Sequence, residues 1–437
     1  MQKAHGAKLR RSDRSGQGST PLARPTGALA VDVIVASVGL LLGSKLFLGL
    51  EKVWAATETI RGGAFIACYL YAIGWLGLRM RRQVADWLIR EARLLLVISG
   101  AVVASALWSF DPKLTVSTSL LFVGTTAIGV FIGYAFEPSR IMTIFISTYL
   151  ILLLVSVLAV LAAPAEVAIS QGPRFDAWVG LQGDKNQLGA SAGLALLLFA
   201  AALFRGRLDI VPGLVLCALA GGVLVMSKSA TALVSSALGF AVLVAFLISA
   251  KARLPSLLTY MLVLCALSSA VYFALAHLIT LTDVIGRDET LTGRTEIWKD
   301  AVGMLHYSPW LGFGYGAVWL ASEQSWLPEF ATTTRVYDAH SGYLTLATQV
   351  GLPVMLLAVA QLVMLSFQSI GYLIHHKTSF AYFAVSFVFW FACYNLTETA
   401  LYRWNSDEWM ILAALMTVIA RRNGMWLREQ RRQGTPD

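Results

Sequence analysis

Residues 141–163 read IMTIFISTYLILLLVSVLAVLAA and contain no charged side chain. About 20 consecutive apolar residues in a helix cross a hydrocarbon layer about 30 Å thick. The stretch also lacks the alternation of apolar and polar residues that is typical of a half-buried strand. It therefore predicts a transmembrane helix.

Similar windows occur along the whole chain. They are residues 29–50, 59–78, 94–110, 114–136, 188–204, 209–226, 231–250, 255–280, 353–371, 379–397 and 408–420. Of the 437 residues, 57% are hydrophobic and 14% are charged. Soluble domains carry about 25% charged residues, so the composition excludes an ordinary soluble domain. We predict an all-α polytopic membrane protein with about 12 transmembrane helices.

The positive charge follows the membrane topology. Most of the 34 Lys and Arg residues lie in the two tails and in short segments between windows. Such segments stay in the cytoplasm, which places both termini there. We attribute the net charge of +9 to residues that set the membrane orientation of the chain and contact membrane lipids. We therefore predict no nucleic acid as a partner.

The windows divide the chain into five parts. Residues 1–28 are basic and rich in Ser, Gly and Pro, which predicts a disordered cytoplasmic tail. Residues 29–280 hold transmembrane helices 1–9, and residues 343–421 hold helices 10–12, followed by a basic cytoplasmic tail at 422–437. Residues 281–342 form an outer loop that is too long to be without structure in a compact protein.

That outer loop contains the amphipathic stretch TEIWKDAVGMLHYSPW (295–310). We expect a surface helix that begins near Thr295 and stops at Pro309. The apolar residues expected on one face of it are Ile297, Trp298, Ala301, Val302 and Leu305.

Charged and polar residues gather at the outer ends of the spans, where the topology does not require them. The stretches are GDKNQLG (183–189), SKSAT (227–231), LTGRTEIW (291–298), DAHSGYL (338–344) and NLTETALYRW (395–404). Ionisable groups at such positions are candidates for a functional site.

The first two stretches offer an anion site. Lys185 and Asn186 precede a span, so their donors lie near the positive end of a helix dipole. Ser227, Lys228 and Thr231 form a turn of hydroxyls and a cation between two spans. A snorkelling lysine with a capping asparagine, and a plain turn, are the alternatives for these two stretches.

The other stretches offer a cation, a base and a carboxylate. Arg294 could bind phosphate oxygens with its planar fork, or it could form a salt bridge with Asp288 or Glu289. His340 is a candidate base, although a single His is more often a packing residue. Glu398 lies on the same face of the membrane, and Arg294, His340 and Glu398 are the candidate catalytic residues.

The combination of these groups suits one kind of chemistry. A diphosphate leaving group needs fixed positive charge, which Arg294, Lys228 and Lys185 supply, and an attacking hydroxyl needs a base. The chain shows no His or Cys pair at ligand spacing and no acidic triplet for a divalent cation. We therefore predict a site without metal or cofactor.

The order of these stretches resembles the O-antigen ligase and polymerase superfamily. The motifs are GDKNQLG, SKSATAL, GRTEIW, PWLGFGYGAVW, AHSGYLTLATQVGLP and YNLTETALYRWN, within roughly residues 180–410. They are most similar to exopolysaccharide polymerases of the ExoQ or Wzy type. The chain differs from the common family pattern at two places. It has Lys228–Ser229–Ala230–Thr231 where family members often have Arg followed by Thr, and Ser341 where they often have Asn after the His. A lysine binds phosphate as a point charge, without the fork of arginine.

The resemblance implies an inverting, metal-independent glycosyltransferase with a GT-C-like fold in the bacterial inner membrane. Its substrate would be undecaprenyl-diphosphate-linked oligosaccharide, polymerised at the periplasmic face into exopolysaccharide or O-antigen. By this analogy Arg294 and Lys228 bind the diphosphate with Lys185 nearby, and His340 orients or deprotonates the acceptor. Chain-length regulators and export proteins are the further partners that the resemblance suggests.

Three alternatives stay open. A ligase would use the same donor chemistry but transfer the glycan to lipid A-core or protein. A transporter or flippase of lipid-linked sugars also needs about a dozen spans, but it usually keeps ionisable groups near the membrane midplane. A scaffold without catalysis would leave the outer cations and His340 unexplained.

Overall fold

The computed structural model describes residues 26–51, 54, 56–80, 82, 84–86, 92–162, 168–170, 176–252, 258–259, 288–320 and 337–433. This part of the chain is helical. Within it, the β-type pairing is an isolated antiparallel bridge between Ile169 and Trp178. The prediction of an all-α protein is therefore confirmed for the residues described.

Most predicted windows coincide with a helix. These helices are α1 (Thr26–Gly43), α3 (Ala56–Arg79), α5 (Arg93–Ala104), α6 (Pro112–Ala135), α7 (Pro138–Ala162), α9 (Lys185–Phe204), α10 (Ile210–Met226), α11 (Ala230–Ala252), α17 (Leu352–His376), α18 (Ser379–Tyr394) and α19 (Asp407–Gln433). Apart from residues 258–259, the window 255–280 lies outside the described residues. The tail expected at 1–28 also lies outside them up to residue 25.

Length and composition make this a polytopic membrane protein. Among the described residues, the helices α3, α6, α7, α9, α11 and α17 are the six that are long and apolar enough to cross a membrane. The helices α1, α5, α10 and α18 are apolar but shorter. The total of twelve spans stays a prediction.

Helix α9 lies at the centre of one part of the bundle, where it packs on α7, α10, α11 and α18. Its contact with α11 depends on a small residue. A Cβ atom at Gly193 would lie 1.9 Å from the Oγ atom of Ser236, so only glycine lets these two helices approach so closely.

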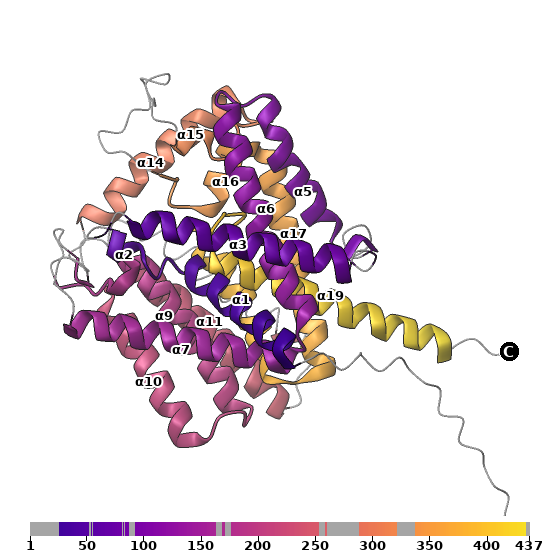
Figure 1. The fold of residues 1–437 in the computed structure, drawn as a ribbon. Helices are drawn as coiled ribbons and strands as arrows, with labels where there is room; N and C mark the ends of the chain where they lie inside the picture. Colours follow the sequence, from indigo (N-terminus) through magenta and orange to yellow (C-terminus); the bar gives the residue numbers. More distant parts are fainter. Residues whose placement is uncertain are drawn as a thin grey trace, which may run out of the picture.

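Helix α19 packs along α6 and extends beyond the bundle. A Cβ atom at Gly129 of α6 would lie 2.5 Å from the Met410 carbonyl oxygen, which again requires glycine. The helix continues to Gln433, so the segment expected as a cytoplasmic tail at 422–437 is helical in its described part. In Figure 1 its C-terminal end projects from the molecule at the end opposite α2 (Leu48–Glu51) and α14 (Asp288–Tyr307).

The outer loop differs from our expectation in detail. Helix α14 begins at Asp288, earlier than Thr295, and packs on α16 (Gly342–Val350). Val302 does not share the buried face, because it is 45% exposed and lies about 100° around the helix from the buried Ala301. The small core under this helix consists of Ala301, Met304, Val318, Trp319 and Ala339, of which Val318 and Trp319 belong to α15 (Ala317–Leu320).

Candidate active site

The segment that carries Glu398 joins α18 to α19, and hydrogen bonds to the Asn395 side chain stabilise its backbone. The Asn395 Oδ1 atom accepts hydrogen bonds from the backbone N–H groups of Ala400 (2.8 Å) and Leu401 (2.7 Å). Gly342 donates its N–H to the carbonyl oxygens of Asn395 and Glu398, at 2.9 Å each. A Cβ atom at Gly342 would lie 2.1 Å from Asn395 Oδ1, so glycine permits this approach. The contact places the start of α16, and thus His340, beside Glu398.

Arg294 of α14 binds two other segments of the chain. Its Nη2 atom lies 2.5 Å from Glu398 Oε1 in an ion pair. Its Nη1 atom donates to the Thr397 carbonyl oxygen at 2.6 Å and to Thr231 Oγ1 at 3.3 Å. The Arg294 side chain is 16% exposed and that of Glu398 is 11% exposed. The guanidinium is thus held in one orientation by partners that are distant in the sequence.

His340 lies between two carboxylates. Its Nδ1 atom is 3.8 Å from Glu398 Oε2 and 3.9 Å from Asp338 Oδ1, and within the described residues this nitrogen has no hydrogen-bond partner. The backbone N–H of His340 donates to Asp338 Oδ1 at 2.8 Å, and the φ angle of His340 is 45°. A left-handed conformation is unusual for a residue with a Cβ atom and persists only where its surroundings hold it.

The carboxylates also set the protonation of the imidazole. Glu398 is the largest cause of a raised pKa for His340, and Asp338 adds to it. Burial and the positive charge of Arg294 oppose this shift but do not cancel it. An imidazolium at this position is therefore stabilised by its neighbours, which suits a group that accepts a proton during a reaction.

Asp338 connects His340 to a second arginine. Its Oδ2 atom lies 2.8 Å from Arg403 Nη1, which also donates to the Thr399 carbonyl oxygen at 2.8 Å. Burial opposes ionisation of Asp338, yet Arg403 and His340 together hold its pKa below the ordinary value. The carboxylate is therefore ionised and shared between two basic groups.

The sequence reasoning missed Asp338, Arg403 and Lys45. The first two lie inside the stretches DAHSGYL and NLTETALYRW, so their charge at a span end was the available signal. Lys45 was placed inside an apolar window, but it lies in the turn after α1 with a φ of 60°. It is within electrostatic range of Asp338, of Asp184 before the first residue of α9, and of Glu408 in α19.

The two predicted anion stretches touch each other. Asp184 caps α9 by accepting hydrogen bonds from the backbone of Asn186 (2.8 Å) and Gln187 (3.0 Å). The Asn186 side chain accepts a hydrogen bond from Ser229 Oγ at 2.9 Å. Lys185, the first residue of α9, is partly exposed. This contact joins GDKNQLG to SKSAT, and Thr231 joins SKSAT to Arg294.

Within SKSAT the residues have different surroundings. Ser227 Oγ donates to the Leu224 carbonyl oxygen at 2.7 Å and accepts from the Ser229 N–H at 3.3 Å, which stabilises the turn. Lys228 forms an ion pair with Asp176, and its side chain is 41% exposed. The structure thus brings together Thr231, Arg294, His340 and Glu398, with Lys228 at the side.

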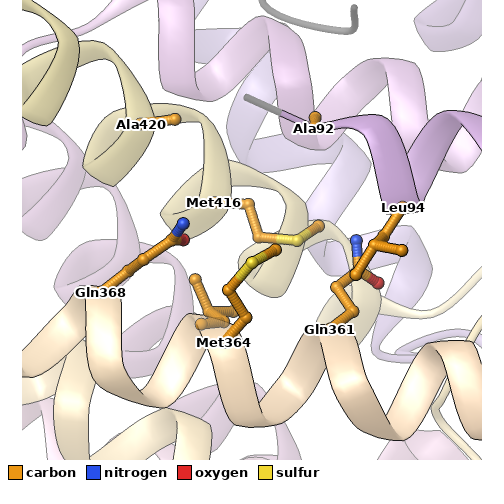
Figure 2. A pocket seen from close by; sticks show the side chains of 8 residues that line it. Ala92, Leu94, Gln361, Met364, Gln368, Met416 and Ala420 are labelled. Carbon is orange, nitrogen blue, oxygen red and sulfur yellow. The ribbon is translucent and has the colours of Figure 1, made fainter. Parts of the chain in front are cut away.

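A pocket of another kind lies between α5, α17 and α19. Figure 2 shows Met364 and Met416 between the side chains of Gln361 and Gln368. Gln361 accepts a hydrogen bond from the Tyr402 hydroxyl at 2.5 Å. Because its lining holds no ionisable side chain, this pocket is separate in character from the charged site.

Fold and site together define a polytopic helical membrane protein with an arginine, a histidine and a carboxylate clustered where α14 and the start of α16 meet the segment after α18. A family model described as O-antigen ligase matches residues 213–359, which include Lys228, Arg294 and His340. The resemblance to the O-antigen ligase and polymerase superfamily is thereby confirmed. Glu398 lies outside the matched segment, although it contacts Arg294. A search of curated proteins found no match.

Proposed function

We propose that the protein is an inverting, metal-independent glycosyltransferase that polymerises undecaprenyl-diphosphate-linked oligosaccharide repeat units. The observation that carries the proposal is the cluster in which Arg294 is bound to Glu398 while His340 faces the same carboxylate. A fixed cation beside a base is the arrangement that displacement of a diphosphate by a sugar hydroxyl requires.

Arg294 is suited to the diphosphate. Its bonds to Thr231, Thr397 and Glu398 use Nη1 and Nη2. A guanidinium has five N–H donors, so donors are left for phosphate oxygens after these bonds are made. Because Glu398 and the Thr397 backbone hold the group in place, it needs little reorganisation when the negative charge of the leaving group develops.

The proposed reaction is a single displacement. The acceptor hydroxyl oxygen forms a bond to the anomeric carbon of the donor sugar as the bond from that carbon to the diphosphate oxygen breaks. The electron pair of the broken bond leaves with the lipid diphosphate, and the hydroxyl proton passes to the neutral imidazole of His340. Glu398 and Asp338 then stabilise the imidazolium, since both lie within 3.9 Å of its Nδ1 atom. Attack from the opposite face inverts the carbon.

The other predicted residues would extend the diphosphate site. Lys228 and Lys185 would add positive charge at its edge, and Asn186 and Thr231 would add polar contacts. Ser227 would act through the turn that carries Lys228, because its hydroxyl is already bound to that turn.

A ligase is the second candidate. A ligase is favoured by the family model that matches the chain, which is described as O-antigen ligase. In a ligase the same cluster would act on the same donor, and the acceptor would be lipid A-core or protein. The reactive residues are the same for both activities.

The proposal includes a cellular setting. The chain would have a GT-C-like fold in the bacterial inner membrane, with both termini in the cytoplasm and the cluster at the periplasmic face. Chain-length regulators and export proteins would then be partners. The position of the C-terminal end of α19 opposite α14 supports this orientation (Figure 1).

The test is reconstitution of the purified full-length protein with lipid-linked repeat units alone, with and without EDTA. A polymerase lengthens the glycan without a second acceptor, and the proposal predicts that EDTA leaves the rate unchanged. Product formed only after lipid A-core or protein is added would identify a ligase. Loss of activity in EDTA that magnesium restores would contradict the metal-independent mechanism.

A further inference from the structure

The Asp338–Arg403 ion pair forms one wall of a second polar pocket. The pocket lies between α15, α16 and the segment after α18, and its lining includes Asp338, Thr399, Arg403, Gln349 and Trp404. Asp338 Oδ1 accepts the backbone N–H of His340, whereas Oδ2 binds Arg403. One carboxylate therefore belongs to both the candidate base and the pocket.

Two polar side chains of this pocket make no side-chain hydrogen bond within the described residues. Gln349 is 3% exposed, yet in the described part of the chain its side-chain amide makes no hydrogen bond. The same holds for the indole N–H of Trp404, whose ring is fixed edge-to-face on Tyr315 at a centroid distance of 5.3 Å. Trp404 is only partly buried, and both residues line the pocket, so their polar groups are available to pair with a ligand bound there.

The lining indicates a neutral ligand that carries hydroxyl groups. The charges of Asp338 and Arg403 compensate each other, so the pocket lacks the excess positive charge that a second anion would need. An amide, a carboxylate, a guanidinium and a threonine can donate to and accept from hydroxyl groups. An indole ring offers an apolar face with a polar N–H at its edge. A sugar ring has the matching pattern of hydroxyl groups around a C–H face.

We propose that this pocket binds the terminal sugar of the acceptor glycan, a proposal that rests on the glycosyltransferase function above. The acceptor belongs here because the pocket shares Asp338 with His340, which takes the hydroxyl proton. The donor diphosphate belongs at Arg294, which is bound to the other carboxylate, Glu398. Asp338 and Glu398 thus separate the two substrates around one imidazole.

The test uses initial rates of transfer by the purified full-length protein. The donor is the lipid-linked repeat unit, and the acceptor is the free oligosaccharide released from that donor by mild acid. Gln349→Ala removes the unpaired amide, and Trp404→Phe removes the indole N–H while keeping an aromatic ring against Tyr315. Gln368→Ala is the matched control, because this glutamine lines the other pocket on α17 (Figure 2).

We expect both pocket variants to raise the half-saturating acceptor concentration about three- to tenfold, because each loses one or two neutral hydrogen bonds to the acceptor. The half-saturating donor concentration should stay within about twofold of wild type, and Gln368→Ala should change neither constant. Unchanged acceptor constants in both variants, or equal changes for donor and acceptor, would overturn the proposal for this pocket. No transfer by the wild-type protein would reject the glycosyltransferase function and the acceptor pocket with it.

Discussion

Arg294 and Lys228 were both expected at the diphosphate, but the structure surrounds them differently. Arg294 is 16% exposed and bound to groups from two other segments, including the carboxylate of Glu398. Lys228 is 41% exposed, and its partner Asp176 is 72% exposed. The first cation is enclosed by the fold, whereas the second is accessible to solvent.

This difference ranks the two residues. Removing one partner of an enclosed ion pair leaves the other charge buried and uncompensated, which costs about 3–5 kcal/mol. An exposed ion pair contributes about 0–1 kcal/mol and is screened by salt. We therefore regard Arg294 as the centre of the site and Lys228 as an auxiliary cation.

The largest effect is expected for Arg294→Ala. Transfer from lipid-linked donor should fall at least about 100-fold, because charge stabilisation at the leaving group is lost. The control is Lys299→Ala, an exposed cation on the same helix. Arg294→Lys keeps the charge without the fork and should retain part of the activity. Full activity of folded, membrane-inserted Arg294→Ala would contradict the role of this residue.

A slightly smaller effect is expected for His340→Ala. The turnover number should fall about 100-fold, at the lower end of the loss typical for a general base, while donor binding stays close to wild type. His306→Ala, an exposed histidine at the end of α14, serves as the control. An unchanged turnover number would remove His340 from the mechanism.

The pH profile should change in Glu398→Gln. Because carboxylates raise the pKa of His340 above its ordinary value of 6.5, the neutral base becomes the major form only above that raised pKa. Wild-type turnover should therefore rise with pH and level off above it. Glu398→Gln removes the largest cause, so the rising limb should move to lower pH even though the maximal rate falls. Glu296→Gln, an exposed carboxylate on α14, should leave the midpoint in place, and an unmoved midpoint in Glu398→Gln would refute the assignment.

The smallest effect is expected for Lys228→Ala. The half-saturating donor concentration should rise about two- to fivefold with little change in turnover, since this cation is exposed and already paired. Asp176→Ala frees Lys228 and should not weaken donor binding. A loss in Lys228→Ala as large as that in Arg294→Ala would remove the ranking of the two cations.

Much of the fold followed from hydropathy. The apolar windows coincide with long helices because their length and lack of charge leave few other structures in a bilayer. The end of α14 before Pro309 was predicted, but its start at Asp288 was not, and neither was its packing on α16. Val302 was wrongly assigned to the buried face of this helix. The apolar character of a residue does not show whether its side of the helix packs on another element.

The site was predictable as a set of stretches, whereas its pairing was not. Arg294 was expected either at phosphate or in a salt bridge with Asp288 or Glu289, but its partner is Glu398, 104 residues away. Nothing in a single sequence joins positions so far apart. The close approach at Gly342 that places His340 beside Glu398 is likewise a property of the packed chain.

The most direct measurement is a cryo-electron microscopy structure of the full-length protein in a lipid nanodisc with undecaprenyl diphosphate. The account predicts phosphate oxygens within about 3 Å of the Arg294 guanidinium, with the His340 imidazole turned toward the same cavity. A diphosphate bound in the pocket between α5, α17 and α19, or at the end of the bundle where α19 projects, would contradict it.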